Sequence, residues 1–208
     1  YIPHDLTKGA VPGHKVLVSQ RNDGKNYMGE IIKIIGHKND VGVDILSFVY
    51  QYEFNPTFPD EVISATDEIP TEVSLSDIEG RVDLRDKTIF TIDGDDTKDI
   101  DDSISIKKLS PDVYELGVHI ADVSHYVKRD SILDKEAYER GTSVYLVDRV
   151  IPMIPHKLSN GICSLNPNVD RLALSCVMNI NSKGYVISYK IFPSVIRSRK
   201  QMTYNCAV

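Results

Sequence analysis

Six of the ten residues from 93 to 102 are aspartates, and this acidic segment constrains the fold more than any other feature of the chain. It lies between two short apolar segments, residues 89–92 and 103–106, which we expect to be strands. Closely spaced carboxylates repel one another and raise one another's pKa, so the segment is costly unless something compensates its charge. The sequence therefore predicts a turn between two strands that gathers negative charge in one place.

A hard divalent cation would compensate this charge. Magnesium prefers oxygen ligands, usually one or two carboxylates completed by water and substrate phosphate. Two such ions can activate a water molecule and stabilise the leaving oxygen of a phosphodiester. The acidic segment alone thus favours a metal-dependent phosphoryl-transfer site.

Other interpretations of the acidic segment have to be weighed. A calcium-binding EF-hand loop needs Gly at its sixth position and Glu at its twelfth, but counting from Asp93 these are Lys98 and Ile104. A phosphatase of the haloacid-dehalogenase type uses the pattern D-x-D-x-T after an apolar strand, and Asp93 to Thr97 match it, with Asp93 as the nucleophile. An exposed acidic turn without any function also stays open at this point.

Charge is distributed unevenly along the chain. The formal net charge is −6, which by itself argues against a nucleic-acid partner. Residues 171–208, however, contain no Asp or Glu, and their basic residues are Arg171, Lys183, Lys190, Arg197, Arg199 and Lys200. An acidic segment followed by a basic one suits a site that holds cations and a polyanion together, although a solvated basic face explains the second segment equally well.

Hydrophobic alternation predicts two domains of mixed α+β class. Residues 13–36 read as strands with a turn at Asp23–Gly24 and suggest part of a small β-barrel, and a helix is expected over 59–68. In the second domain we expect strands at 89–92, 103–106, 113–120, 172–180 and 184–196, with a helix at 131–140. The predicted domains are residues 1–70 and 71–208.

Several motifs, in order, resemble the ribonuclease R and ribonuclease II family of 3′→5′ exoribonucleases. The acidic pattern Asp93-x5-Asp99-x-Asp101-Asp102 is the first of them. The others are Asp83–Arg85, Ile89–Gly94, His119–Tyr126, Arg140–Tyr145, Arg149–Pro155, Leu158–Gly161, Cys163–Pro167 and Val169–Arg171. Upstream, residues 36–40 and 42–46 are similar to the end of the cold-shock domain that precedes the catalytic domain in this family. The resemblance implies a partial OB-like β-barrel followed by the N-terminal part of a mixed-sheet RNB catalytic domain.

The resemblance also implies the chemistry. RNA would be hydrolysed one nucleotide at a time from a single-stranded 3′ end, releasing nucleoside 5′-monophosphates. Asp93, Asp99, Asp101 and Asp102 would be the catalytic carboxylates and the ligands of Mg²⁺. Asp96 fits the family pattern in a supporting role, and Asp95 is the least certain of the six aspartates.

Four further residues are expected to contact RNA by the same resemblance. Tyr145 matches a tyrosine near the 3′-terminal base, where an aromatic face can stack on any base, and Tyr204 matches one that positions the 3′ end. Arg197 and Arg199 precede Tyr204 and are expected to meet phosphates. Asp148 adds negative charge near Tyr145, where the family usually has an aromatic-Pro segment.

His119, Asp122 and His125 could be drawn as a zinc site, but the family does not use them so, and we expect structural hydrogen bonds instead.

Other features bound the setting of the protein. No apolar run approaches the roughly 20 residues that cross a membrane. The spacing of Cys163, Cys176 and Cys206 matches neither a metal site nor a disulfide framework, and this lack of a pattern fits a reducing cytoplasm. The sequence indicates no protein partner. We expect the 208 residues to be part of a longer enzyme and to be nearly inactive alone. The alternatives are an RNA-binding module without catalysis and the phosphatase.

Overall fold

The computed structural model describes residues 1–22 and 27–207, so the expected Asp23–Gly24 turn lies outside the described residues. The chain divides into two compact units. The first contains residues 1–58 together with 144–151, and the second contains residues 59–143 together with the chain from 152 onward. The sequence predicted a domain boundary after residue 70. In the structure, residues 59–70 belong to the second unit, and the segment that carries Tyr145 belongs to the first.

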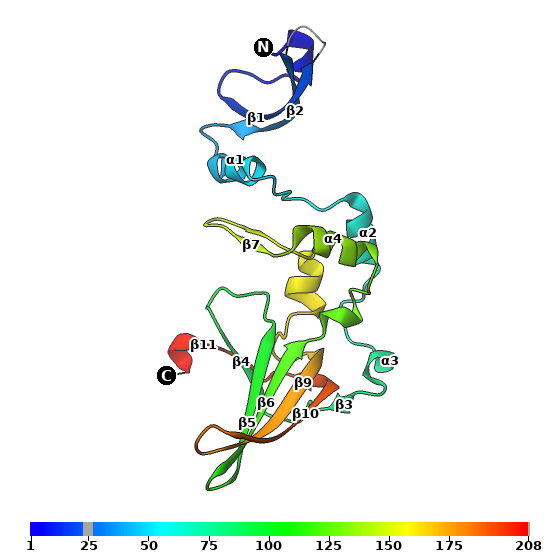
Figure 1. The fold of residues 1–208 in the computed structure, drawn as a ribbon, viewed down its shortest axis with the longest axis vertical. Helices are drawn as coiled ribbons and strands as arrows, with labels where there is room; N and C mark the ends of the chain where they lie inside the picture. The colour runs from blue at the N-terminus through cyan, green and yellow to red at the C-terminus, as the bar shows by residue number, and fades with distance from the viewer. Residues whose placement is uncertain (23–26, 208) are drawn as a thin grey trace. The chain divides into compact units, whose positions relative to one another are not determined.

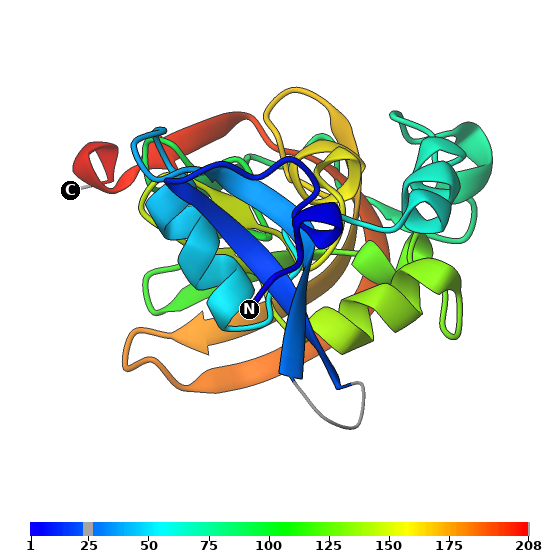
Figure 2. The same ribbon diagram turned by 90° about the horizontal axis from the view of Figure 1, so that it is seen from above.

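The first unit is built on an antiparallel hairpin of β1 (His14–Asn22) and β2 (Tyr27–His37), which confirms the strands expected there. Helix α1 (Val43–Gln51) packs against this hairpin (Figure 2) and was not predicted. It begins after Gly42, whose φ of 78° lies in the left-handed region that glycine adopts readily. Strands β7 (Val144–Tyr145) and β8 (Val150–Ile151) form a second, short hairpin.

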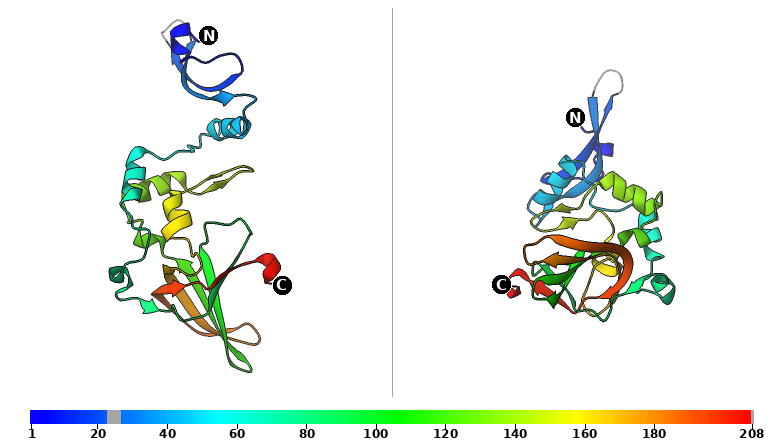
Figure 3. Two further views of the ribbon diagram at one scale, coloured as in Figure 1. Left: turned by 180° about the vertical axis from the view of Figure 1, so that it is seen from behind. Right: turned by 60° about the horizontal axis from the view of Figure 1, so that its bottom comes forward.

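The second unit contains a seven-stranded mixed sheet in the order β11-β4-β5-β6-β9-β10-β3 (Figure 1). The five central strands, β4, β5, β6, β9 and β10, pair antiparallel with their neighbours. At the two edges, β11 pairs parallel with β4 and β3 pairs parallel with β10. The bounds are β3 Val82–Asp83, β4 Ile89–Asp93, β5 Asp102–Ser110, β6 Val113–Ala121, β9 Asp170–Asn181, β10 Val186–Arg197 and β11 Lys200–Thr203. The β9–β10 hairpin curves strongly, as the right-hand view of Figure 3 shows. The expected strands and the mixed α+β class are confirmed.

Helices α2 (Asp60–Asp67) and α4 (Ile132–Arg140) pack against each other beside this sheet (Figure 1). Both were expected from sequence. The Ser131 hydroxyl caps α4 by accepting a hydrogen bond from the Asp134 amide, and Gly141, with φ of 71°, ends the helix. The shorter elements are α3 Leu75–Ile78, η1 His4–Leu6, η2 Val123–His125, η4 Tyr204–Cys206 and a π-helical turn, η3, at Lys157–Ile162. No helix in the described part of the chain is long and apolar enough to span a membrane.

A buried polar row crosses the covered face of the sheet. His119 on β6 is fully buried, with Nδ1 2.7 Å from the Ser175 hydroxyl and Nε2 3.1 Å from the Ser105 hydroxyl. The Ser175 hydroxyl is in turn 2.6 Å from that of Ser194 on β10. Gly117 leaves the room for this row, because a Cβ there would lie 2.4 Å from the Ser105 oxygen. The middle of the covered face therefore carries small and polar side chains, whereas Ile89 and Ile196 are buried on the same face nearer its sides.

Acid is expected to weaken the fold through His119. Burial lowers the pKa of this imidazole from 6.5 to about 4. An unfolded histidine takes up its proton near pH 6.5, so the unfolded chain binds more protons between pH 6.5 and 4 and the free energy of unfolding falls as the pH drops through that window. The contribution of His119 to this loss reaches about 3 kcal/mol by pH 4.

Denaturant unfolding of the wild type and His119→Gln across this pH range measures the effect. The difference between the two proteins in free energy of unfolding should shrink as the pH falls from 7 to 4, because the variant lacks the titrating group. Carboxylates titrate in both proteins and cancel in the difference. A difference that is constant with pH would contradict the prediction.

Candidate active site

The acidic segment leaves one strand and enters the next within the second unit. Asp93 is the last residue of β4 and Asp102 is the first of β5. These strands pair only at Ile89 with Ser105 and at Phe90 with Ile104, so they separate before the aspartates begin. The residues from 94 to 101 therefore form a loop at one end of the sheet, as the sequence predicted.

Ile100 anchors this loop in the hydrophobic core. Its side chain is 1% exposed and packs in a buried cluster that includes Ile89, Leu165 and Ile196. The carboxylates of Asp99 and Asp101 flank it along the chain. Burying the isoleucine draws the backbone inward between the two aspartates and stabilises the loop through the hydrophobic effect.

Backbone hydrogen bonds fix the rest of the loop. The Ala121 amide donates to the Asp101 carbonyl at 2.9 Å, and the Leu165 amide donates to the Ile100 carbonyl at 2.9 Å. On the other side, the Gln201 side-chain amide donates to the Thr97 carbonyl at 3.1 Å. The loop is thus held by three segments that are distant from it in sequence, and the carboxylates sit on a supported frame.

The electrostatics show that the structure brings the four predicted carboxylates together. Burial, and then the like charges of Asp102 and Asp99, raise the pKa of Asp93. Partial desolvation, and then the like charges of Asp99, Asp102 and Asp93, raise the pKa of Asp101. Neither Asp95 nor Asp96 is among the like charges that raise these two pKa values, although both are exposed, as are Asp101 and Asp102.

The donor set fits a magnesium ion that is completed by other ligands. Asp93 Oδ2 is buried and has no hydrogen-bond partner in the described part of the chain, so a cation there would relieve both its desolvation and the repulsion among the carboxylates. Among the described residues, no three His, Cys, Asp or Glu side chains are arranged so that they could hold a metal ion together, so at most two of these carboxylates could bind one ion as they stand. Magnesium usually takes only one or two carboxylates and fills its remaining positions with water and phosphate.

Tyr204 is carried to the same end of the sheet. Strand β11 runs parallel to β4, with Thr203 opposite Asp93, and Tyr204 follows directly in η4. Its side chain is 66% exposed. Tyr204 therefore begins beside the end of β4, where the acidic loop starts, and it is exposed.

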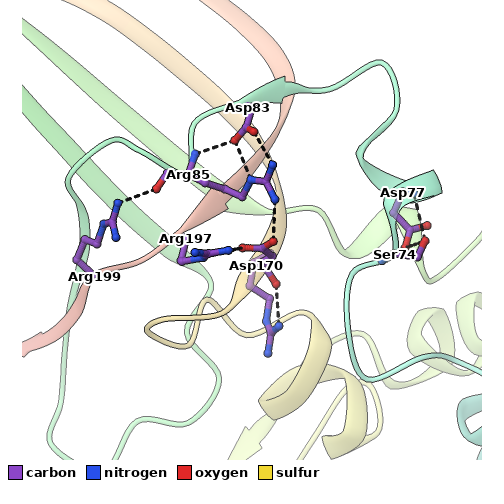
Figure 4. Close-up of polar contacts among 8 residues, drawn as sticks. Ser74, Asp77, Asp83, Arg85, Asp170, Arg197 and Arg199 are labelled. Carbon is purple, nitrogen blue, oxygen red and sulfur yellow. Dashed lines mark hydrogen bonds and ion pairs between the residues drawn. The ribbon is translucent and has the colours of Figure 1, made fainter.

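The two predicted phosphate-binding arginines have protein partners (Figure 4). Arg197 forms an ion pair with Asp170, with its Nη2 2.6 Å from the carboxylate, and Asp170 also accepts from Arg85 at 3.0 Å. Arg199 donates to the neutral Arg85 carbonyl at 3.0 Å. The charge of Arg197 is thus compensated within the protein, whereas the described contact of Arg199 leaves its positive charge uncompensated.

Tyr145 belongs to the first unit, unlike the acidic loop. It is 64% exposed on the short β7 strand. Asp148, which adds negative charge near this tyrosine, forms an ion pair with Arg149 at 2.8 Å. The Arg149 side chain therefore compensates that charge.

His119, Asp122 and His125 do not form one site. His119 belongs to the buried polar row of the sheet. Asp122 accepts from Arg81 at 2.7 Å, and His125 Nε2 lies 3.0 Å from an Asp77 carboxylate oxygen. All three side chains make structural hydrogen bonds, as expected.

The sequence analysis did not identify the buried residues whose hydrogen bonds hold the backbone of the acidic loop. Ser164 and Arg171 belong to motifs noted in the sequence, but no role was assigned to them. The hydroxyl of Ser164 hydrogen-bonds the loop backbone, and the buried guanidinium of Arg171 donates to the Ser164 carbonyl. The signal available was a serine and an arginine inside apolar segments, where a polar side chain needs a buried partner.

Comparison with known proteins agrees with this arrangement. The RNB domain family matches residues 81–207, and the cold shock domain family matches residues 1–59. Ribonuclease R 1 of Lactococcus lactis is 48% identical over 205 residues, which are 95% of this chain and 25% of that protein. The chain thus spans a quarter of that relative's length.

Solved structures share the fold. Mycoplasma genitalium RNase R in complex with double-stranded RNA superposes with a TM-score of 0.91 at 27% identity, covering 99% of this chain and 37% of that one. Yeast Ssd1, described as a pseudonuclease, superposes with a TM-score of 0.73 at 18% identity, covering 99% of this chain and 27% of that one, and so shows a likeness of fold alone. The RNB match covers more than half of the residues, including the whole acidic loop, and on this evidence the chain belongs to the RNB domain family.

Proposed function

We propose that the protein to which these 208 residues belong is a magnesium-dependent 3′→5′ exoribonuclease that releases nucleoside 5′-monophosphates. The observation that carries this proposal is the gathering of Asp93, Asp99, Asp101 and Asp102 in one mutually repelling group at the end of β4. The RNB match and the ribonuclease R relatives support RNA as the substrate.

Each residue has a role in the proposed reaction. The four carboxylates hold the metal ions and orient the attacking water, while magnesium, when bound, supplies positive charge that stabilises the phosphodiester transition state. Tyr204, beside Asp93, positions the 3′-terminal nucleotide at the carboxylates. Arg199 contacts a phosphate, and Arg197 does so at the cost of its pairing with Asp170.

Tyr145 would stack on a base near the 3′ end. An aromatic face grips any base, so this contact adds affinity without selecting a sequence. Single-stranded RNA is the substrate that offers such an unstacked base.

Degradation of RNA labelled at its 5′ end tests the reaction in the longer protein. We expect stepwise shortening with release of nucleoside 5′-monophosphates, because the carboxylates act at the terminal phosphodiester. Fragments from internal cleavage would contradict the exonuclease proposal. Hydrolysis of a small phosphate ester, abolished by Asp93→Asn, would instead favour the phosphatase interpretation.

Magnesium binding to the 208-residue chain is a separate expected result. Calorimetry should detect binding by the wild type and little or none by the double variant Asp101→Asn with Asp102→Asn, because two ligands are lost. The double variant Asp95→Asn with Asp96→Asn makes the same change of charge at exposed positions of the same loop and should bind magnesium like the wild type. Equal binding by all three proteins would contradict the assignment of the site.

We further propose that the 208 residues alone degrade RNA weakly or not at all, since they span a quarter of the matched relative's length. The three cysteines are unpaired, which supports a reducing compartment such as the cytoplasm as the place of action.

A further inference from the structure

Ser164 links the acidic loop to the rest of the second unit through one buried hydroxyl. The residue is 0% exposed and follows the π-helical turn η3. Its Oγ donates to the Lys98 carbonyl at 2.7 Å and accepts from the Ile100 amide at 3.1 Å. This carbonyl and this amide belong to the two peptide groups on either side of the Asp99 Cα, so a single hydroxyl restrains both backbone dihedrals of Asp99.

The serine is itself held in place. Arg171 Nε donates to the Ser164 carbonyl at 2.7 Å, and its Nη2 donates to the Gly161 carbonyl at 3.1 Å. The amide of the next residue, Leu165, donates to the Ile100 carbonyl. The backbone on both sides of the Ser164 hydroxyl is therefore held by hydrogen bonds of its own.

We propose that Ser164 is a positioning residue that sets the direction of the Asp99 carboxylate, one of the four carboxylates assigned to metal binding. The inference rests on the proposed function, because it assigns these carboxylates to a metal. A site of this kind tolerates errors of only about 0.5 Å in its ligands. Loss of a group that orients a metal ligand typically lowers metal affinity by about 10- to 100-fold.

A purely structural role for the hydroxyl makes a different prediction. Any buried serine with two hydrogen bonds contributes to stability, and Ser194 provides the matched case. It is 0% exposed, its hydroxyl lies 2.6 Å from that of Ser175 and donates to the Ala173 carbonyl at 3.2 Å, and neither partner belongs to the acidic loop. Ser164→Ala and Ser194→Ala should thus lower the melting temperature similarly but differ in metal binding.

The test is the affinity of the 208-residue chain for Mn²⁺, used as a paramagnetic substitute for magnesium and measured by electron paramagnetic resonance of the free ion. Ser164→Ala is expected to weaken Mn²⁺ binding by about 10- to 100-fold, and Ser194→Ala should leave it unchanged. In the metal-free protein, the backbone amides of residues 98–102 should exchange their hydrogens faster in Ser164→Ala than in Ser194→Ala.

Two variants separate failure of this inference from failure of the proposed function. If Asp99→Asn weakens Mn²⁺ binding and Ser164→Ala does not, the positioning role is overturned while the metal site stands. If neither Asp99→Asn nor Ser164→Ala changes the affinity, the metal site is wrong and the inference is overturned with it. Should Ser164→Ala fail to fold, Ser164→Cys decides, since its weaker hydrogen bonds should give a reduced affinity and wild-type affinity would overturn the proposal.

Discussion

Replacing Asp101 with asparagine is expected to slow RNA hydrolysis by the longer protein roughly 10³-fold, which corresponds to about 4 kcal/mol of lost transition-state stabilisation. Asparagine keeps the shape of the side chain but removes the negative charge that binds the metal. Because Asp101 is coupled to Asp93, Asp99 and Asp102, its loss disturbs the charge of the whole group. RNA binding should remain, since other residues make the proposed contacts with bases and phosphates.

Single-turnover hydrolysis and fluorescence anisotropy of labelled RNA measure the two effects of Asp101→Asn separately. Asp95→Asn is the matched control, because it removes the same charge from an exposed position in the same loop, and it should retain nearly full activity. An Asp101→Asn enzyme that cleaves RNA at the normal rate would rule out a catalytic role for this carboxylate. Equal losses in binding and in hydrolysis would indicate a role in RNA affinity instead.

Ile100→Ala is expected to lower the free energy of unfolding by about 3 kcal/mol, because it removes a buried side chain and leaves a cavity in the core. Ile106, on the neighbouring strand β5, is 59% exposed, so Ile106→Ala should cost less than about 0.5 kcal/mol. Chemical denaturation followed by circular dichroism provides the comparison. Similar losses for the two variants would show that Ile100 does not anchor the acidic loop.

The sequence was a good guide to individual elements. Alternation of apolar residues located the long strands β5, β6, β9 and β10, and the capping residues Ser131 and Gly141 located the helix between them. Both signals are local, since strand alternation and helix caps depend on residues close together in the chain. The chemistry of the acidic segment was equally local, because six carboxylates in ten residues demand compensation wherever they fold.

Alternation did not show which face of the sheet would be covered. The covered face carries the buried His119, Ser175 and Ser194, whereas large apolar side chains on the opposite face, such as Leu174 and Ile191, are 48% and 60% exposed. A strand pattern gives two faces but does not say which of them another layer will pack against. Ile89 and Ile196 are buried on the covered face as well, so this face mixes large apolar side chains with small and polar ones.

Tertiary partners were also beyond the sequence. Ser164 reaches Ile100 across 64 residues, and a hydroxyl in an isolated segment gives no sign of which backbone groups it will bond. The same holds for Tyr145, which the resemblance assigned to the catalytic domain but which the fold groups with the first unit. Packing between distant parts of the chain determines the partners of Ser164 and the unit that contains Tyr145, and local sequence patterns do not report on such packing.

The inward side chain of Ile100 also limits how this loop can change during evolution. Insertion or deletion of one residue between positions 99 and 102 would place a carboxylate at the position that the core requires to be apolar. Burial of an unpaired carboxylate is far more costly than a small loss of packing. Residues 95–97, which lie on the exposed side of the loop apart from the partly buried Thr97, have no such requirement. Variation in length among related enzymes is therefore expected before Lys98 and should be rare from Asp99 onward.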